Sequence, residues 1–297
     1  MAIEISNTPI TIIFALQTLL CVQHFLYLIE LICIMAAILI FFVAHWYLSL
    51  FSQTFFQHRY AAHRAFTMSK FWERFFFVFA YITQGSSYMS PRVYAILHRI
   101  HHAYTDTELD PHSPSYDKNL FSMMLRTSKT YVGIMYGRIA VEDKFTKNVP
   151  EWGWFDRWGN NWYSRILWSA VYVWFYIVFA PSAWWYLLIP FHIAMGPVHG
   201  MVINWFAHKY GDVNYETDNT SKNLFKVDLL MLGEGYHNNH HMHPSRPNFA
   251  AKKGELDLCY PMIALLKKCG VIKVSLIENI IKPNQPVIHK GQEMFVP

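Results

Sequence analysis

The chain has 297 residues, of which 53% are hydrophobic and only 15% are charged, so it is more apolar than an average soluble domain. Its net charge of +5 is not gathered in a basic run or recognition motif, which excludes a nucleic-acid-binding role. The four cysteines form no Cys-x-x-Cys pair, which excludes a rubredoxin-like or zinc-ribbon site. Composition therefore predicts a membrane-embedded protein.

The first long apolar stretch runs from Ile10 to Phe51, and its only charged residue is Glu30. At roughly 1.5 Å of helical rise per residue, it could cross a hydrocarbon core of roughly 30 Å twice. We therefore expect two antiparallel transmembrane helices, at about 10–28 and 32–55, with a turn near Glu30. No glycine or proline marks that turn, so one kinked span with a re-entrant segment is the alternative.

The next segment, to about residue 162, is polar overall but contains amphipathic pieces. One of them, Phe71–Tyr81, is expected to lie along the membrane interface. Breaks at Gly85-Ser86-Ser87 and Ser90-Pro91 precede a helix that carries His98, and Asp110-Pro111 ends this helix.

A second apolar region, from Ile166 to Ala207, contains no charged residue. The approach to it is rich in tryptophan, as in an aromatic belt at a membrane surface: Trp152, Trp154, Trp158 and Trp162. Pro181 provides a turn in the middle of the region. We therefore expect transmembrane helices at about 163–180 and 184–206.

The short turns near Glu30 and Pro181 contain no lysine or arginine. The basic residues lie instead beside the histidine-bearing segments, and they are Arg59, Arg64, Lys70, Arg157, Lys209 and Lys222. By the positive-inside rule, segments 56–162 and 207–297 are expected in the cytosol. The predicted architecture is an all-α, integral multi-pass membrane protein. A single domain, 1–297, would have about four transmembrane helices and a helical cytosolic cap. A bacterial inner membrane is favoured over the endoplasmic reticulum.

Histidines gather in four clusters that would all lie on this cytosolic side. Residues three and four apart on a helix share one face, so His98, His101 and His102 can point towards one volume. The nine histidines are His58, His63, His98, His101, His102, His208, His237, His240 and His241. Nine imidazoles are too many for one metal ion and about right for two.

Iron, copper, nickel and zinc all accept imidazole ligands, but zinc sites use three or four protein ligands, often including thiolates. Nine histidines without a cysteine among them therefore favour a dinuclear redox centre. Soluble carboxylate-bridged di-iron bundles are disfavoured, because Glu234 with His237 is the only Glu-x-x-His pair. Four histidines on apolar stretches are expected to be hydrogen-bonded structural residues: His24, His45, His192 and His199.

Three of these clusters resemble the histidine boxes of the membrane-bound fatty acid desaturases, in the acyl-CoA, stearoyl-type (delta-9-like) branch. The boxes are His58-Arg59-Tyr60-Ala61-Ala62-His63, His98-Arg99-Ile100-His101-His102 and His237-Asn238-Asn239-His240-His241. His208 in Asn204-Trp205-Phe206-Ala207-His208 and the sequence Asp110-Pro111-His112 match the family as well. The resemblance extends from the second predicted helix to about Asp257.

The resemblance implies two iron ions. One would be held by His58, His63, His98 and His237, with Asn204 reaching it through water. The other would be held by His101, His102, His208, His240 and His241. Ferrous iron, O2 and two electrons would then convert two adjacent methylenes of an acyl chain into a cis double bond, with water as the other product.

The resemblance also implies a fatty acyl thioester substrate, with acyl-CoA expected first. The family tends to place an arginine two residues before the second box, where this chain has Ile96; Arg92, Arg126 and Lys129 are candidate replacements. The sequence contains no His-Pro-Gly-Gly, Cys-x-x-Cys or dinucleotide-binding motif. We therefore expect a separate ferredoxin-like or cytochrome-like donor, with its reductase, on the basic cytosolic face.

An acyl chain needs a narrow apolar tunnel. The predicted tunnel residues share a helical face with His58, although ordinary packing would place them there as well: Trp46, Tyr47, Leu50, Phe51 and Thr54. Ligating histidines usually donate their second N–H to a carboxylate. Five acidic residues near the boxes are candidates for this role: Asp106, Glu108, Asp110, Asp228 and Glu234. Of these we select Asp110 and Glu234.

Three other functions remain open at this point. A di-iron hydroxylase or monooxygenase acting on a lipid or alkane would share the boxes, because their spacing sets the metal site and not the product. A non-catalytic membrane heme protein would use a histidine pair such as His45 and His192. A zinc-dependent membrane hydrolase is disfavoured, because no His-Glu-x-x-His motif occurs.

Overall fold

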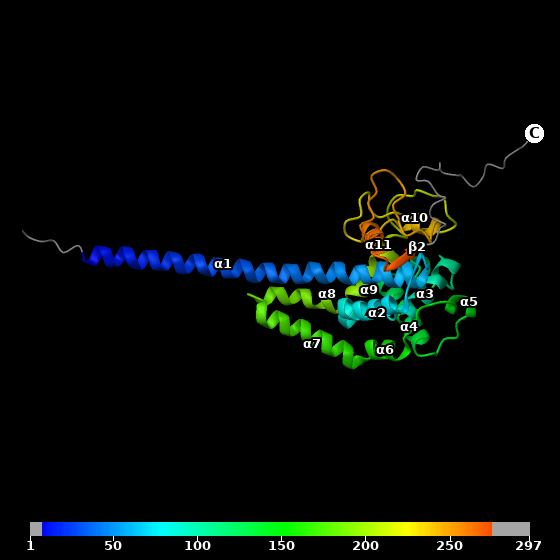
Figure 1. Ribbon diagram of the computed structural model, residues 1–297, viewed down its shortest axis with the longest axis horizontal. Coiled ribbons are helices and arrows are strands. Elements are labelled where there is room, and N and C mark those ends of the chain that lie inside the picture. The colour runs from blue at the N-terminus through cyan, green and yellow to red at the C-terminus, as the bar shows by residue number, and fades with distance from the viewer. Residues whose placement is uncertain (1–7, 275–297) are drawn as a thin grey trace, which may run out of the picture.

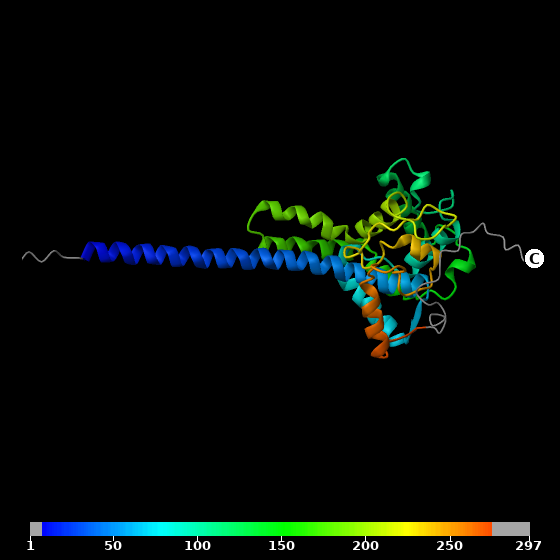
Figure 2. The same cartoon turned by 90° about the horizontal axis from the view of Figure 1, so that it is seen from above.

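The computed structural model describes residues 8–274, which are mostly helical. Helix α1, Thr8–Phe51, continues into a π-helix, η1, Ser52–Ala62. In Figures 1 and 2, the first half of α1 projects alone, α7 and α8 lie along its second half, and the remaining elements gather at its C-terminal end.

The predicted turn near Glu30 does not form, because α1 is one continuous helix through this residue. No glycine or proline occurs between Ile10 and Phe51, so nothing in the backbone interrupts the helix, and one glutamate is not enough to reverse it. The predicted helices at about 10–28 and 32–55 are therefore wrong as a hairpin.

The second apolar region forms the predicted pair of helical segments, but only the first is regular. Helix α7, Trp162–Phe179, matches the prediction closely. The second segment is divided into η4, Ala183–Leu188; α8, Ile189–Ile193; α9, Met195–Met201; and the π-helix η5, Val202–Phe206. Its two halves, Ala183–Ile193 and Met195–Phe206, are bent by 69°.

Proline explains this bend. Pro197 has no N–H to donate to the carbonyl of Ile193, so the helical hydrogen bond across the bend cannot form. The freed carbonyl of Ile193 instead accepts a hydrogen bond from Ser86 Oγ at 3.1 Å, and Gly196 N–H donates to Ser87 Oγ at 3.0 Å. The bend is thereby fixed to η2, Gly85–Ser87.

Within residues 8–274, Leu16–Ala62 is the one unbroken helix whose length and composition suit a membrane crossing. A second segment is long and apolar enough to cross a membrane only when the two halves of the bent pair, Ala183–Ile193 and Met195–Phe206, are counted as one span.

The histidine-bearing end of the molecule is built from shorter elements. These are α2, Lys70–Gln84; α3, Pro91–Tyr104; η3, Pro114–Tyr116; α4, Leu120–Met135; α5, Asp143–Thr146; α6, Gly153–Gly159; α10, His237–Met242; and α11, Cys259–Lys268. A two-stranded antiparallel sheet, β1 (Phe66–Met68) with β2 (Ile272–Val274), was not predicted. Helix α3 begins as expected, with the Ser90 side chain accepting from Val93 N–H and Pro91 in the first turn.

The π-helix η1 lies in the centre of this end. Its Phe55 and Phe56 are fully buried and pack against Phe76 of α2. Arg59 is also fully buried, with Nη2 2.7 Å from Asp257 Oδ2, so an ion pair ties the C-terminal part of the chain to η1.

This buried ion pair leads to a stability prediction. Replacing Arg59 with leucine leaves the Asp257 carboxylate buried and unpaired, so Arg59→Leu should destabilise the protein by about 3–5 kcal/mol. A large fall in Tm, followed by tryptophan fluorescence in detergent, is the expected result. The double variant Arg59→Leu/Asp257→Asn should recover part of the loss. Glu142→Gln removes an exposed ion pair with Lys144 and should leave Tm unchanged; equal Tm values for Arg59→Leu and Glu142→Gln would refute the stabilising role.

Candidate metal centre

The nine predicted histidines come together between η1, α3, the end of η5 and α10. Their ring nitrogens form two groups, and within each group the ligand atoms lie within 4.8 Å of one another. The first group is His58, His63, His98, His102 and His240, and the second is His101, His208, His237 and His241.

The Nε2 atoms face inward in both groups. In the first, His98 Nε2 lies 2.7 Å from His63 Nε2, and His102 Nε2 lies 2.9 Å from His240 Nε2. In the second, His237 Nε2 is 3.0 Å from His241 Nε2. Nitrogens that each lie ~2.1 Å from a common metal ion are separated by about 3 Å, so the donor atoms fit two metal ions.

The structure divides the histidines differently from the split that the resemblance implied. His102 and His240 belong to the first group and His237 to the second. The reason is helical periodicity, because His98 and His102 are four residues apart on α3 and share a face, whereas the intervening His101 points to the other group.

The first box depends on the π-helix. The N–H of His63 donates to the carbonyl of His58 at 3.1 Å, a hydrogen bond between residues five apart. In this wider helix, residues five apart are about one turn apart, so both imidazoles reach the same group. An α-helix over this segment would rotate them away from each other.

Carboxylates hold the outer Nδ1 atoms of two ligands. Asp110 lies 2.9 Å from His101 Nδ1, and Glu234 lies 2.8 Å from His58 Nδ1. An Nδ1–H that donates to a carboxylate leaves the Nε2 lone pair free to face the group. Thr54 Oγ1 donates a further hydrogen bond to Glu234.

His208 has partners that were not selected from the sequence. Its Nδ1 lies 3.2 Å from Thr220 Oγ1 and 3.8 Å from Asp106 Oδ2. Burial alone would raise the pKa of Asp106, but hydrogen bonds from His208, Ser113 and the backbone of Thr220 lower it overall. No sequence pattern links Thr220 to Asp106, since they are joined only by the fold. Asp228, another of the acidic candidates, instead accepts backbone N–H groups in the loop that carries Glu234.

Burial and the neighbouring histidines together shift the acid–base behaviour of the ligands. Both effects lower the pKa well below its usual value in His63, His98, His101, His102, His237, His240 and His241. These imidazoles are therefore neutral at physiological pH, which is the state that binds metal ions.

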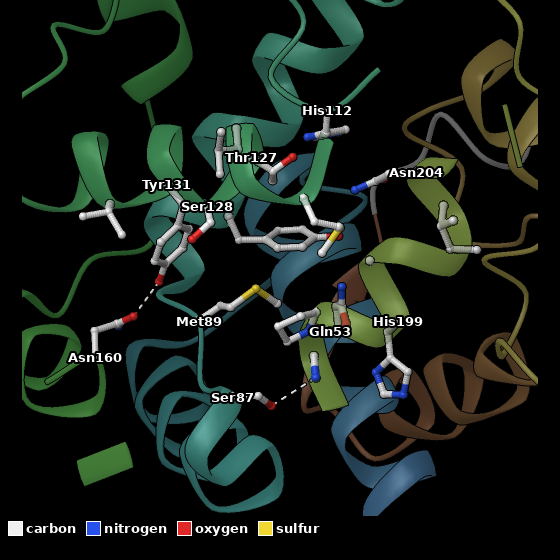
Figure 3. Close-up of a pocket in the computed structure, with 18 of the residues that line it drawn as sticks. Gln53, Ser87, Met89, His112, Thr127, Ser128, Tyr131, Asn160, His199 and Asn204 are labelled. Atoms are coloured by element: carbon white, nitrogen blue, oxygen red, sulfur yellow. Dashed lines mark hydrogen bonds between the residues drawn. The ribbon is translucent and has the colours of Figure 1, made fainter. Parts of the chain in front are cut away.

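A cavity of about 830 Å³ extends from this centre, and His58, His98, His237 and Asn204 all line it. Its walls come from η1, α3, α4, α7 and α9. Figure 3 shows lining side chains from three of these elements, with Gln53 on η1, Thr127, Ser128 and Tyr131 on α4, and His199 on α9. The lining contains exposed residues of α4 and α7, such as Phe121 and Trp162 with relative exposures of 78% and 77%, so the cavity opens there.

Of the five predicted tunnel residues, only Leu50 lines this cavity. Trp46 Nε1 and Tyr47 OH donate to the carbonyls of Leu230 and Leu229, both at 3.1 Å, and Phe51 stacks on Phe55. Thr54 contacts Glu234. The prediction assumed a regular α-helix up to His58. The wider turns of η1 instead rotate the face that carries the ligands away from the face that carries the predicted tunnel residues.

Two apolar-stretch histidines also test the alternative of a heme. The rings of His45 and His192 stack at a centroid distance of 4.9 Å, and their Nδ1 atoms are 2.6 Å apart. Tyr176 OH contacts the other nitrogen of His192 at 3.0 Å. The two imidazoles bind each other directly, so this pair cannot hold a heme between them.

Comparison with known proteins identifies the family. The model of the family described as fatty acid desaturase matches residues 12–254, which include all nine histidines. The chain belongs to the fatty acid desaturase family. It is therefore an oxidoreductase of a membrane-associated family.

The most similar relatives include different acyl desaturases. The Delta-9 desaturase-like 5 protein of Arabidopsis thaliana is 28% identical over 232 residues, which cover 74% of this chain and 70% of the relative. The Acyl-CoA C20 Delta5-desaturase of Anemone leveillei is 28% identical over 254 residues, covering 82% and 73%. The sn-1 stearoyl-lipid 9-desaturase of a Synechocystis species is 28% identical over 224 residues, covering 73% and 64%.

The contact between Asp110 and His101 predicts an effect on metal retention. Asp110→Asn removes the carboxylate that orients this ligand, and the loss of such a partner typically weakens metal binding 10–100-fold. After dialysis against a chelator, elemental analysis should find less metal in Asp110→Asn than in the unmodified protein. The exposed Asp143→Asn should retain metal like the unmodified protein, and equal retention in both variants would contradict an orienting role.

Proposed function

We propose that this desaturase family member uses two iron ions and O2 to introduce a cis double bond into the acyl chain of a fatty acyl thioester, with acyl-CoA as the first candidate. The observation that carries the proposal is that two adjacent groups of histidine nitrogens border a cavity of about 830 Å³. One feature provides the metal ligands, and the other provides room for an extended chain.

The donor set suits iron. Nine imidazoles, two of them in contact with carboxylates at Nδ1 and with no cysteine among them, form a nitrogen-rich site of the kind that ferrous iron accepts. Bound iron would supply the oxidation, in which O2, two electrons and two protons take two hydrogens from adjacent methylenes to leave the alkene and two water molecules.

The protein's own residues would position the reactants. The cavity wall would exclude bulk water from the acyl chain and present its methylenes to the face lined by His58, His98 and His237. Asn204 lies on the same wall and would hold a water molecule against the first group. Glu234 and Asp110 would keep His58 and His101 in the tautomer with a free Nε2.

The acyl carrier is proposed from the residue that precedes the second histidine box and from the candidate basic residues. Ile96 is fully buried, and Arg126 is engaged by Asp117 and the Ser113 carbonyl, so neither is placed to meet a nucleotide. Arg92 and Lys129 are the remaining candidates for contact with coenzyme A.

Electrons would come from a separate ferredoxin-like or cytochrome-like protein and its reductase. This donor would dock on the cytosolic side, where basic residues flank the histidine segments.

The direct test is gas chromatography of fatty acids from a host that expresses the chain. A new monounsaturated acid would support desaturation and would also report double-bond position and chain length. A hydroxylated acid without an alkene would instead support the rival hydroxylase function, which the same metal centre could serve.

His101→Ala is expected to abolish desaturation, because it removes one ligand of the second group. His24→Ala should retain full activity, since His24 is exposed on α1 and its ring contacts the Leu20 carbonyl of its own helix. Both variants should insert in the membrane at similar levels, checked by immunoblotting. Equal loss of product in the two variants would mean that the histidine assignment does not identify the active centre.

Chain-length preference should depend on Gly200 rather than on Trp46. Gly200 lies on α9 in the cavity wall, and a Cβ there would only approach Asn204 Nδ2 at 3.8 Å, so a larger side chain fits the backbone but projects into the cavity. Gly200→Leu should shift the products towards shorter acyl chains. Trp46→Ala should leave chain length unchanged, and a shift in Trp46→Ala alone would contradict this placement.

A further inference from the structure

Two buried polar side chains line the cavity without satisfying their hydrogen bonds. His199 on α9 is 1% exposed, and neither of its ring nitrogens has a hydrogen-bond partner among residues 8–274. Gln53 on η1 is 7% exposed, and its Oε1 also lacks a partner within that range. The expectation that His199 is a satisfied structural histidine is therefore wrong.

Both side chains precede, by five positions, another residue that lines the cavity. Gln53 precedes His58 by five residues, and His199 precedes Asn204 by five residues, so each is about one helical turn further towards the membrane-spanning part of the chain. All four side chains line the one cavity, and Figure 3 shows Gln53 and His199 in its lower part, below Asn204. A ligand that reaches the histidines can therefore also reach Gln53 and His199.

Other polar groups in this part of the wall are already engaged. Ser86 Oγ donates to the Ile193 carbonyl, and Ser87 Oγ donates to the Gln84 carbonyl at 2.8 Å. Leu50 and Ile203, which line the same cavity, are apolar. His112 also lines the cavity without a partner for either ring nitrogen among residues 8–274, but Figure 3 shows it at the top, away from Gln53 and His199. In the lower part of the cavity, a plain hydrocarbon chain beside Gln53 and His199 would leave both unpaired at considerable cost.

The chemistry of the two side chains identifies the group that fits. A neutral imidazole offers one N–H donor and one acceptor nitrogen, and the Gln53 oxygen is an acceptor. A hydroxyl can accept from the His199 N–H and donate to Gln53 Oε1 at the same time. A carbonyl can only accept, so it would leave the Gln53 oxygen unpaired.

We propose that the preferred substrate is a hydroxylated acyl chain, whose hydroxyl group binds between Gln53 and His199. The hydroxyl lies about one helical turn, or roughly 5 Å, from the methylenes that face the histidines. This inference rests on the proposed desaturase function and narrows its substrate class.

The test is a binding measurement that does not require turnover. Purified protein in detergent is loaded with a fluorescent fatty acid, which is displaced by stearic acid or by each member of a series of monohydroxystearic acids. At least one hydroxyl position should displace the probe at roughly tenfold lower concentration than stearic acid, because it satisfies groups that stearic acid leaves unpaired. His199→Phe and Gln53→Leu should each abolish this preference.

A matched control is Thr127→Val, because Thr127 also lines the cavity but its hydroxyl already contacts the Pro111 and Met123 carbonyls. This variant should keep the preference for the hydroxylated acid. Displacement by stearic acid equal to or better than by every hydroxystearic acid would overturn the inference and leave the desaturase proposal intact. Failure of all the acids to displace the probe would count against both.

Discussion

The structure depends on bringing nine imidazoles so close together that Nε2 atoms within each group lie about 3 Å apart. Such an arrangement is incompatible with protonated rings, because positive charges at this distance repel strongly in a buried site. Burial and mutual proximity lower the pKa of most of these histidines, so the lone pairs stay available. Carboxylates at Asp110 and Glu234 fix two of the tautomers from outside.

Segments that depart from a regular α-helix bring the imidazoles this close together. The π-helix η1 turns His58 and His63 to one side, and η5 carries the chain to Asn204 and His208. The bend before Pro197 exposes the Ile193 carbonyl, which η2 satisfies through Ser86. These irregular segments border both the metal centre and the cavity, so the same distortions that gather the ligands also shape the space beside them.

The sequence predicted the parts that short-range spacing determines. The nine histidines, the helix that starts at Ser90-Pro91 and the helix at about 163–180 follow from box spacing, capping and hydropathy. The prediction of a turn near Glu30 was wrong, because it rested on the length of the apolar stretch and on one charged residue, whereas a helix reversal needs a residue that breaks the backbone helix. The predicted tunnel residues other than Leu50 do not line the cavity beside the histidines, because hydropathy does not reveal a π-helix. The histidines group differently from the implied division, because chain order does not show which faces of α3 and α10 meet. The contact of His208 with Thr220 joins segments that no local pattern relates.

We propose that the two histidine groups hold two metal ions per chain. The most direct measurement is elemental analysis of the protein purified from iron-replete cells, combined with Mössbauer spectroscopy after growth on enriched iron. We expect close to two iron ions per chain, in two distinguishable nitrogen-rich environments, since one group has five ring nitrogens and the other has four. A single iron per chain in active protein would contradict it.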